Sequence, residues 1–450
     1  MTMENRYIGS VKLFATSDAL GWITERVKSK GDLKKKCGVE IIDKFYDWKT
    51  GRGRFGDSIG TIEAGSYSDD TQLMLAVARS IKPDGNIDYH YFAKRELASW
   101  YKYNRGAGNT VSNAAIKISR KSVNWNTNFF TYNKNGKTRD YRDCGANGAA
   151  MRILPIVLAN RGNFKKIKEN IFGNAIITHG HPRAILGAIL YGYALDSIFK
   201  HTPQSINGLK FLEGMSKVLD NVFNLTFVGK PEFVEWIRIW NDNSQARNFL
   251  SEYNDELFAT KKKVKDLADY LKHGYSLKEV YSKLDCFTKG KISYGTNTVL
   301  AGIYTFCKYL DDPENGTIEA VNTLGSDTDT IAGFVGGLFG ALYGDDIIPE
   351  KWKDVQDSDY LDEVAKKLYE ISSGNQSQIK SVAAIKGKDI STIIDDQFSI
   401  GDTVYLALLG NGKVISKVLR PSHHKGKEKL YLGVRFDIGQ SCIFSKLIPE

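Results

Sequence analysis

The sequence has little cysteine, and the few cysteines present exclude a disulfide-stabilised scaffold. Its 450 residues include five cysteines, which are dispersed and form no Cys-x-x-Cys pair. An odd, scattered set is poorly suited to a disulfide framework and favours a reducing compartment. The first residues also lack a charged segment followed by an apolar core, so we predict no secretory leader and expect a cytoplasmic protein.

Long hydrophobic runs are missing as well. The longest apolar stretch, residues 330–344, is full of glycine and is shorter than the roughly 20 residues that a membrane-spanning helix needs. We therefore interpret it as a buried helix and expect no contact with a membrane. With 42% hydrophobic and 25% charged residues, the chain has the composition of an ordinary globular protein.

Acidic residues are outnumbered by basic ones. The formal net charge is +10 and the isoelectric point is about 9.0. A positive balance suits anionic ligands, such as pyrophosphates and nucleic acids. The alternative is that the lysines are scattered for solubility, since dense basic runs are few.

Helical periodicity dominates the first four-fifths of the chain. Apolar residues recur at three- and four-residue spacing, which predicts a mainly helical domain over residues 1–371. Clear helices are predicted at 71–81, 182–198 and 296–310, with Pro182 in a first helical turn. Two stretches are predicted as insertions: 123–142 as a loop or hairpin, and 231–291 as a charged helical lid or side excursion.

A change of composition follows Ile371. Small polar residues predict a linker over 372–397, and the pattern from 398 to 450 becomes strand-like. Gly410-Asn411-Gly412 separates two apolar runs and predicts a hairpin turn. Several short strands in so few residues predict a small β-barrel of SH3-like type. This basic module would contact a protein or a nucleic acid, or would instead pack against the helical domain.

Two acidic clusters carry the chemistry, each at the start of an apolar helix. The first is Tyr67-Ser68-Asp69-Asp70-Thr71 and the second is residues 325–330, Gly-Ser-Asp-Thr-Asp-Thr. One carboxylate at a helix N-terminus is an ordinary cap, but several converging carboxylates repel one another unless cations neutralise them. Mg²⁺ and Mn²⁺ prefer carboxylate, hydroxyl and water oxygens, whereas zinc prefers Cys and His, which both clusters lack. The alternative is two unrelated acidic caps.

Glycines recur along the helix that follows the second cluster. Gly333, Gly336, Gly337 and Gly340 share one face, and each costs about 1 kcal/mol relative to alanine in a helix interior. This pattern predicts that a neighbouring helix approaches closely. Such an approach would draw the two acidic clusters together.

Five segments resemble motifs of the ADP-ribosylglycohydrolase family and occur in the family's order. The resemblance extends over residues 11–344, and the best-known branch of this family reverses arginine ADP-ribosylation of dinitrogenase reductase. The segments are SDALGWITE at 17–25, YSDDTQ at 67–72, GANGAAMRILPI at 145–156, THGHPRA at 178–184 and SDTDTIAG at 326–333.

The resemblance implies a compact, all-helical domain with two Mg²⁺ ions at its centre, Mn²⁺ being the alternative metal. It implies that Glu25, Asp69 and Asp329 are catalytic. Implied metal ligands are Ser68, Asp69, Asp70, Asp327, Asp329 and Thr330, and implied substrate-binding residues are Asn147, Gly148, His179, Gly106 and Gly108. Ser17, Ser68, Ala146 and Ser326 depart from the family's usual residues, which affects substrate choice more than metal binding.

Each of these residues also has an ordinary structural interpretation. Glu25 fits a solvated helix residue, His179 fits a helix cap, and Asn147-Gly148 fits a plain turn. The favoured function is a Mg²⁺-dependent hydrolase that releases ADP-ribose from an N- or O-glycosidic bond of an ADP-ribosylated protein or other macromolecule. The alternatives are another two-metal hydrolase, such as a phosphodiesterase, and a non-catalytic binding or immunity protein.

Overall fold

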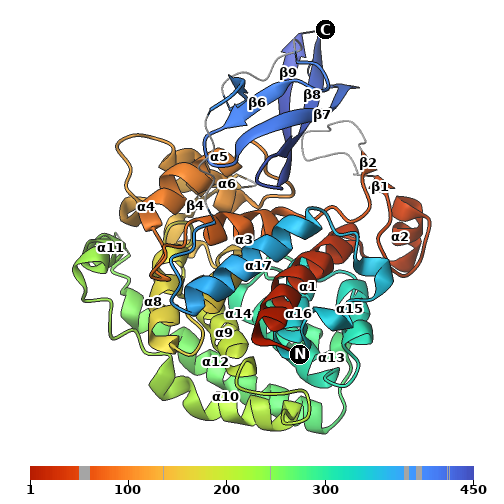
Figure 1. Ribbon diagram of the computed structural model, residues 1–450. Helices are drawn as coiled ribbons and strands as arrows, with labels where there is room; N and C mark the ends of the chain where they lie inside the picture. The colour runs from red at the N-terminus through yellow and green to blue at the C-terminus, as the bar shows by residue number, and fades with distance from the viewer. Residues whose placement is uncertain are drawn as a thin grey trace.

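A helical body is covered at one end by a five-stranded sheet (Figure 1). The computed structural model describes residues 1–49, 61–134, 136–243, 245–379, 385–391, 398–422, 424 and 426–449. The helices are α1 (Met3–Thr24), α2 (Lys30–Cys37), α3 (Asp69–Arg79), α4 (Tyr89–Tyr91), α5 (Ala98–Trp100), α6 (Asn109–Ile118), α7 (Leu154–Ala159), α8 (Phe164–Ala175), α9 (Pro182–Ile198), α10 (Gly208–Val222), α11 (Pro231–Asn241), α12 (Phe249–Lys272), α13 (Leu277–Lys283), α14 (Gly295–Lys308), α15 (Pro313–Asn322), α16 (Thr328–Tyr343) and α17 (Ser358–Ser372).

The predicted helices are present close to their expected bounds. The stretches predicted at 71–81, 182–198 and 296–310 form α3, α9 and α14, and Pro182 is the first residue of α9. The glycine-rich stretch forms α16, whose residues are buried from Thr328 to Leu342. Among the described residues, no helix is both long and apolar enough to span a membrane.

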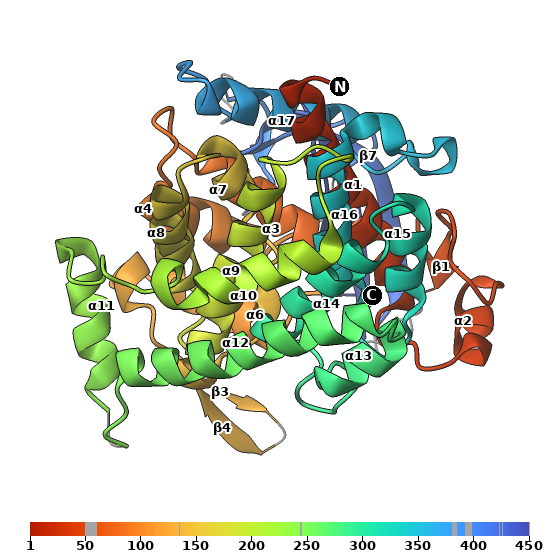
Figure 2. The same cartoon turned by 90° about the horizontal axis from the view of Figure 1, so that it is seen from below.

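Helices α1 and α16 lie side by side at the centre of the body (Figures 1 and 2). A Cβ atom added at Gly340 would overlap the carbonyl of Gly9, and one added at Gly336 would overlap the carbonyl of Leu13. The close approach predicted from the glycines is therefore confirmed, and the neighbour is α1. Since α1 also contacts α3, it connects the two helices that begin at the acidic clusters.

The body is not purely helical, because two short β-ribbons interrupt it. Strands β1 (Trp48–Lys49) and β2 (Thr61–Ile62) pair beside α2, and β3 (Thr131–Lys134) pairs with β4 (Lys137–Asp140). The second ribbon lies within 123–142, which was predicted as a loop or hairpin, and it projects from the body at the lower edge of Figure 2. The predicted excursion 231–291 forms α11, α12 and α13, of which α12 packs against α9, α10 and α14.

The C-terminal sheet has the strand order β5-β6-β7-β8-β9. The parallel pair is β5 with β6, and the remaining neighbours are antiparallel. Strand β5 falls within the stretch 372–397 that was predicted as a linker, so part of that stretch is sheet. The strands are β5 (Lys388–Asp389), β6 (Thr403–Leu406), β7 (Gly410–Pro421), β8 (Lys427–Phe436) and β9 (Ser441–Pro449).

The hairpin turn predicted at residues 410–412 was wrong in position. Leu406 pairs with Gly410, so the turn comprises residues 407–409, and Gly410-Asn411-Gly412 begins β7. A Cβ atom at Gly412 would come within 2.8 Å of the Arg435 carbonyl oxygen, which shows that the glycine serves close strand packing. Tertiary contacts therefore override a strong local turn signal.

The sheet docks on the helical body through buried polar contacts. The Gln440 side-chain oxygen accepts a hydrogen bond of 2.6 Å from the Arg79 guanidinium, which also pairs with Glu96. The backbone N–H of Ser441 donates to the Asp357 carboxylate at 2.9 Å, and Arg435 pairs with the same carboxylate. The described part of the module is thus fastened to α3, η1 (Phe92–Leu97) and the start of α17.

Candidate active site

A cavity of about 750 Å³ opens between the N-termini of α3 and α16, the end of α1, and the loops before α6 and around η4 (Asn147–Ala149). Every residue predicted for the site lines this cavity, with the exception of Ser68. Those lining residues are Glu25, Asp69, Asp70, Gly106, Gly108, Asn147, Gly148, His179, Asp327, Asp329 and Thr330.

Carboxylates from three helices converge on the cavity floor. One oxygen from each of Glu25, Asp327 and Asp329 lies within 4.8 Å of the other two, a spacing suited to a metal ion. Thr330 of the second cluster hydrogen-bonds Asp70 of the first. The two acidic clusters, which are separated by more than 250 residues in sequence, therefore form one site.

Burial and repulsion between neighbours raise the pKa of two aspartates on the floor. Burial raises the pKa of Asp69 well above its ordinary value, and the neighbouring Glu25 charge raises it further. Burial likewise raises the pKa of Asp329, with Glu25 and Asp327 contributing by repulsion. Like charges in a desolvated site disfavour ionisation, so a bound cation would favour the ionised form of these carboxylates.

The donor set fits hard divalent cations. The Oδ2 atom of Asp70 is buried and has no hydrogen-bond partner among the described residues, which is unusual for a carboxylate oxygen in a protein interior. Oxygen ligands surround it, and the cavity lining includes a single histidine, His179. This chemistry matches Mg²⁺ or Mn²⁺ better than zinc.

Asp18 is a site residue that sequence reasoning missed. It lies on α1 and accepts hydrogen bonds from the backbone N–H groups of Ser68 and Thr71 and from the Thr71 hydroxyl. Its signal was a lone acidic residue within the apolar run of the SDALG segment. Asp18 therefore fixes the N-terminus of α3, and with it Asp69 and Asp70, against α1.

Ser68 is the N-cap residue of α3 and does not line the cavity. Its hydroxyl accepts from the backbone N–H of Asp70 at 3.2 Å and also bonds Asp18. Both contacts are typical of an N-cap residue. Its predicted role as a metal ligand stays a prediction.

The η4 turn is attached to the carboxylate floor. The Asn147 side-chain amide donates to the Asp327 carboxylate at 2.9 Å, and its backbone N–H donates to the Ser293 carbonyl at 2.8 Å. Beneath the turn, the buried Arg152 guanidinium donates to the Gly148 carbonyl at 2.9 Å. Arg152, to which the sequence assigned no role, thus positions this part of the cavity wall.

His179 is neutral and presents one free ring nitrogen. Burial lowers the pKa of His179 well below its ordinary value, and Arg152 lowers it further. The Thr178 hydroxyl accepts from Arg152 at 2.9 Å and lies 2.7 Å from Nδ1 of His179 but 3.5 Å from its other acceptor, the Ala175 carbonyl, so the shorter bond assigns its proton to Nδ1. The Nε2 atom, buried and without a partner among the described residues, is therefore a donor available to a ligand.

Gly106 and Gly108 shape the part of the cavity wall that precedes α6. Gly106 has a φ of +77°, and a Cβ atom there would lie 3.1 Å from Asp69 Oδ1, so a side chain would crowd the carboxylate. Gly108 is the N-cap of α6, and a Cβ atom there would meet nothing within 4 Å. The first glycine is required by the backbone, whereas the second leaves open space.

Glu25 ends α1 at the cavity edge. Its backbone N–H caps the helix by donating to Gly21, and its carboxylate accepts from Arg26 at 3.0 Å. Burial nevertheless raises the pKa of Glu25, with Arg26 opposing the shift and Asp327 adding to it. Lys36, whose ammonium lies 4.0 Å from the Trp48 ring centroid, is a nearby cation that the sequence did not single out; burial lowers its pKa to about 8.

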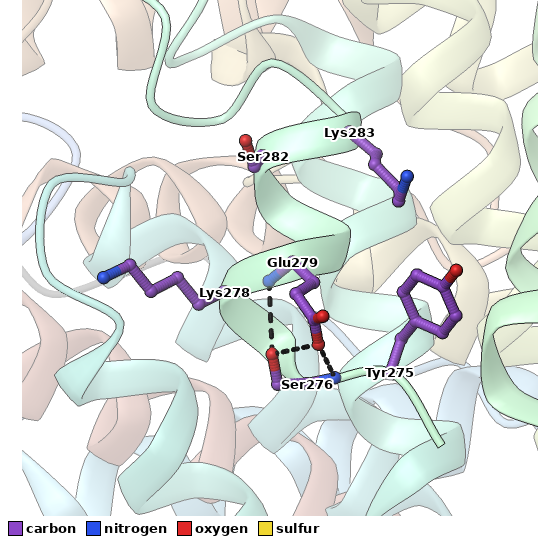
Figure 3. Close-up of a pocket in the computed structure, with 6 residues that line it drawn as sticks. All are labelled: Tyr275, Ser276, Lys278, Glu279, Ser282 and Lys283. Atoms are coloured by element: carbon purple, nitrogen blue, oxygen red, sulfur yellow. Dashed lines mark hydrogen bonds between the residues drawn. The ribbon is translucent and has the colours of Figure 1, made fainter. Parts of the chain in front are cut away.

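A second depression, over α13, differs in chemistry (Figure 3). It is lined by Tyr275, Ser276, Lys278, Glu279, Ser282 and Lys283. The Ser276 hydroxyl donates to the Glu279 carboxylate at 2.6 Å, and both side chains form the capping box of α13. Its polar groups are thus engaged in holding the helix, which leaves the carboxylate cavity as the candidate active site.

The fold and the acidic floor together define a family of hydrolases. The family model described as ADP-ribosylglycohydrolase matches residues 1–378. The chain therefore belongs to the ADP-ribosylglycohydrolase family and is an enzyme that hydrolyses glycosidic bonds. The C-terminal sheet from β5 onward lies outside the matched residues.

Individual relatives agree with this assignment. The zebrafish (Danio rerio) ADP-ribosylhydrolase ARH3 is 28% identical over 316 residues, which span 68% of this chain and 77% of the relative. The ADP-ribosyl-[dinitrogen reductase] glycohydrolase of Rhodospirillum rubrum is 28% identical over 191 residues, 42% of this chain and 57% of the relative. A solved structure titled ADP-ribosylglycohydrolase-related protein complex covers 82% of this chain and 99% of its own, with a TM-score of 0.52 and 18% identity, and shares the fold.

Proposed function

We propose that this protein is a Mg²⁺-dependent hydrolase that cleaves the glycosidic bond between ADP-ribose and a modified macromolecule, releasing free ADP-ribose. The observation that carries the proposal is the convergence of carboxylates from α1, α3 and α16 on one cavity, where Glu25 at the edge pairs with Arg26 but the four aspartates form no ion pair among the described residues. The names of the zebrafish and Rhodospirillum relatives support this substrate class.

Two divalent cations would be held on the floor by the acidic clusters. The ligand candidates are Asp69, Asp70, Asp327 and Asp329, with Thr330 and Ser68 as hydroxyl ligands and Glu25 within reach of the second cluster. Bound there, the cations would lower the pKa of a nucleophilic water and orient the ribose hydroxyls.

The chain's own groups would bind and orient the substrate around the breaking bond. Glu25, whose pKa is raised by burial, would position the ribose or accept a proton from the attacking water. The neutral Nε2–H of His179 would donate a hydrogen bond to the substrate, and the backbone amide at Gly148 would face its pyrophosphate. The breaking bond has oxocarbenium character, which the surrounding carboxylates stabilise.

Product analysis tests this function against its alternatives. Wild-type protein would be incubated with ADP-ribosylated arginine, ADP-ribosylated serine and ADP-ribosylated nucleic acid, in Mg²⁺ or in EDTA. Release of ADP-ribose in Mg²⁺ and not in EDTA supports glycoside hydrolysis, whereas release of AMP indicates a phosphodiesterase. Binding of a substrate without any cleavage in Mg²⁺ or Mn²⁺ indicates a non-catalytic binding protein and contradicts the proposal.

A further inference from the structure

The β3–β4 hairpin carries its cations on one face. Its register pairs Tyr132 with Arg139 and Lys134 with Lys137. Paired residues share a face, and alternate residues along one strand point the same way, so these four side chains project together. All four line the mouth of the carboxylate cavity, and they include every lysine and arginine between residues 131 and 140.

The like charges on this face destabilise the pairing of β3 with β4. Lys134 lies directly opposite Lys137, and like charges in that position destabilise a strand pair. Within the described part of the chain, neither lysine nor Arg139 forms an ion pair, because the hairpin carboxylate Asp140 is engaged by Arg142 at 3.1 Å. A bound anion would remove the repulsion.

The connection between α13 and α14 adds charge of the same sign to the cavity lining. Lys289, exposed in the connection between α13 and α14, lines the same cavity. The carboxylate that belongs to this rim, Asp143, pairs with Arg247 at 2.9 Å. The mouth thus presents four cations, Lys134, Lys137, Arg139 and Lys289, which we call the cationic rim.

An aromatic ring accompanies these charges. Tyr132 is half-buried, its ring centroid lies 6.2 Å from that of Phe130, and its hydroxyl lies 3.4 Å from the Thr110 hydroxyl in the cavity wall. The ring is thereby held in place beside Arg139 and Lys134. Cations interleaved with a fixed aromatic side chain are typical of surfaces that follow a single-stranded nucleic acid, where phosphates meet the cations and a base stacks on the ring.

We propose that the cationic rim binds the phosphate backbone of a single-stranded nucleic acid that carries the ADP-ribose to be removed. The inference rests on the proposed function and names the class of its target.

An acidic protein segment would use the cations but not the aromatic ring. The diphosphate of ADP-ribose alone carries fewer charges than the four cations of the rim would neutralise. The net charge of +10 favours the same class of partner.

Binding of an unmodified, fluorescently labelled single-stranded DNA 12-mer, measured by anisotropy in EDTA, tests the rim without turnover. The test variant is Lys134→Ser with Lys137→Ser and Arg139→Ser. The matched control is Lys121→Ser with Lys165→Ser and Lys217→Ser, three exposed lysines that do not line the cavity, so both proteins lose three positive charges. We expect roughly tenfold weaker binding for the test variant, less than about threefold for the control, and a salt dependence reduced by about two in log–log slope.

Several outcomes would overturn the inference. Equal weakening in both variants would show that only the overall charge attracts the DNA. Polyglutamate binding as tightly as the oligonucleotide would indicate an acidic protein target, and loss of free ADP-ribose binding in the test variant would assign the cations to the diphosphate. If the wild-type protein cleaves ADP-ribosyl-arginine but does not bind the 12-mer, the nucleic-acid role of the cationic rim is contradicted and the proposed function is not. Protein that binds the 12-mer but releases no ADP-ribose contradicts only the proposed function.

Discussion

The floor of the carboxylate cavity and the interface beneath the C-terminal sheet both bury charged side chains, but in different ways. In the interface, Arg79 and Glu96 are both fully buried and form an ion pair at 2.8 Å, and Asp357 pairs with Arg435. On the floor, among the described residues, Asp69 and Asp329 have like-charged neighbours and no ion pair. The comparison teaches that a buried charge with an internal partner supports the fold, whereas one left without a partner indicates a site completed by a ligand.

The largest effect is expected from removing a carboxylate of the floor. Asp329→Ala should lower Mg²⁺-dependent turnover by more than about a hundredfold, since even residues that only orient metal ligands contribute up to that much. It should also abolish the thermal stabilisation that Mg²⁺ gives the wild-type protein. Turnover assays and Mg²⁺ titrations followed by melting temperature check this, and an unchanged titration would remove Asp329 from the ligand set.

Loss of the whole sheet should affect the fold more than the chemistry. A chain that ends at Ser373 removes Phe444 from the buried ring of Tyr103 and leaves Arg79 and Asp357 without their partners in the sheet. We expect aggregation, or a melting temperature lower by several degrees. A truncated protein that stays monomeric at the full melting temperature would instead favour the alternative role of the module in recruiting a partner.

Breaking the paired charges tests the interface at a single position. Arg79→Met leaves Glu96 buried without its cation and should reduce the free energy of unfolding by about 3–5 kcal/mol. The double variant with Glu96→Leu should recover most of this loss, because both charges are then absent. Urea unfolding of the wild type, Arg79→Met and the double variant measures these free energies. A loss below about 1 kcal/mol for Arg79→Met would show that the ion pair is not needed for stability.

Glu25→Gln removes the charge of this side chain at the cavity edge and keeps its shape. We expect turnover to fall about a hundredfold, the scale of general acid–base catalysis, with a melting temperature near that of the wild type. Glu40→Gln is a suitable control, because Glu40 is 54% exposed and only pairs with Lys34. Equal turnover in both variants would mean that Glu25 has no part in the reaction.

The smallest expected effect is on the pH dependence of the free energy of unfolding. Burial raises the folded-state pKa of Asp69, so the folded chain binds this proton more tightly than the unfolded chain. This contribution to stability is complete below the ordinary aspartate pKa of about 4 and is lost as pH rises through the raised folded pKa. In EDTA, the wild-type protein should therefore lose about 1 kcal/mol or more relative to Asp69→Asn between pH 5 and pH 8.

Mg²⁺ should reverse this trend, because it displaces the same protons and binds more tightly as pH rises. Urea unfolding at the two pH values, with and without Mg²⁺, measures both effects. A stability difference between the two proteins that does not change with pH would show that Asp69 is ionised in the metal-free fold.

Much of the site was predictable because its motifs are short and local. The segments containing Glu25, Asp69, Asn147, His179 and Asp329 are each recognisable by residue type and order, and all five residues line one cavity. The sequence was less informative about the direction of side chains. Ser68 has the right type for a metal ligand, yet its hydroxyl bonds Asp18 and caps α3.

Residues that act through tertiary contacts were harder to find. Asp18 carries no local signal beyond its charge, because its role arises only when α1 lies against the start of α3. The hairpin cations occupy alternate positions on each strand, Lys134 after Tyr132 and Arg139 after Lys137, and this pattern is present in the sequence. Their position beside the cavity depends on how the hairpin packs on the body. The turn predicted at Gly410 failed for a related reason, since pairing of β7 with β8 decided the conformation of those glycines.

The sequence by itself determined the helical periodicity, the glycine face of α16, the two acidic clusters and the five family motifs, because each depends on residues within one turn or one strand of one another. The tertiary structure alone decided that α1 is the helix that approaches those glycines, that the sheet packs on α3 and α17, and that the cations of β3 and β4 surround the cavity. Such arrangements depend on the summed burial and pairing of segments hundreds of residues apart, for which no local pattern exists.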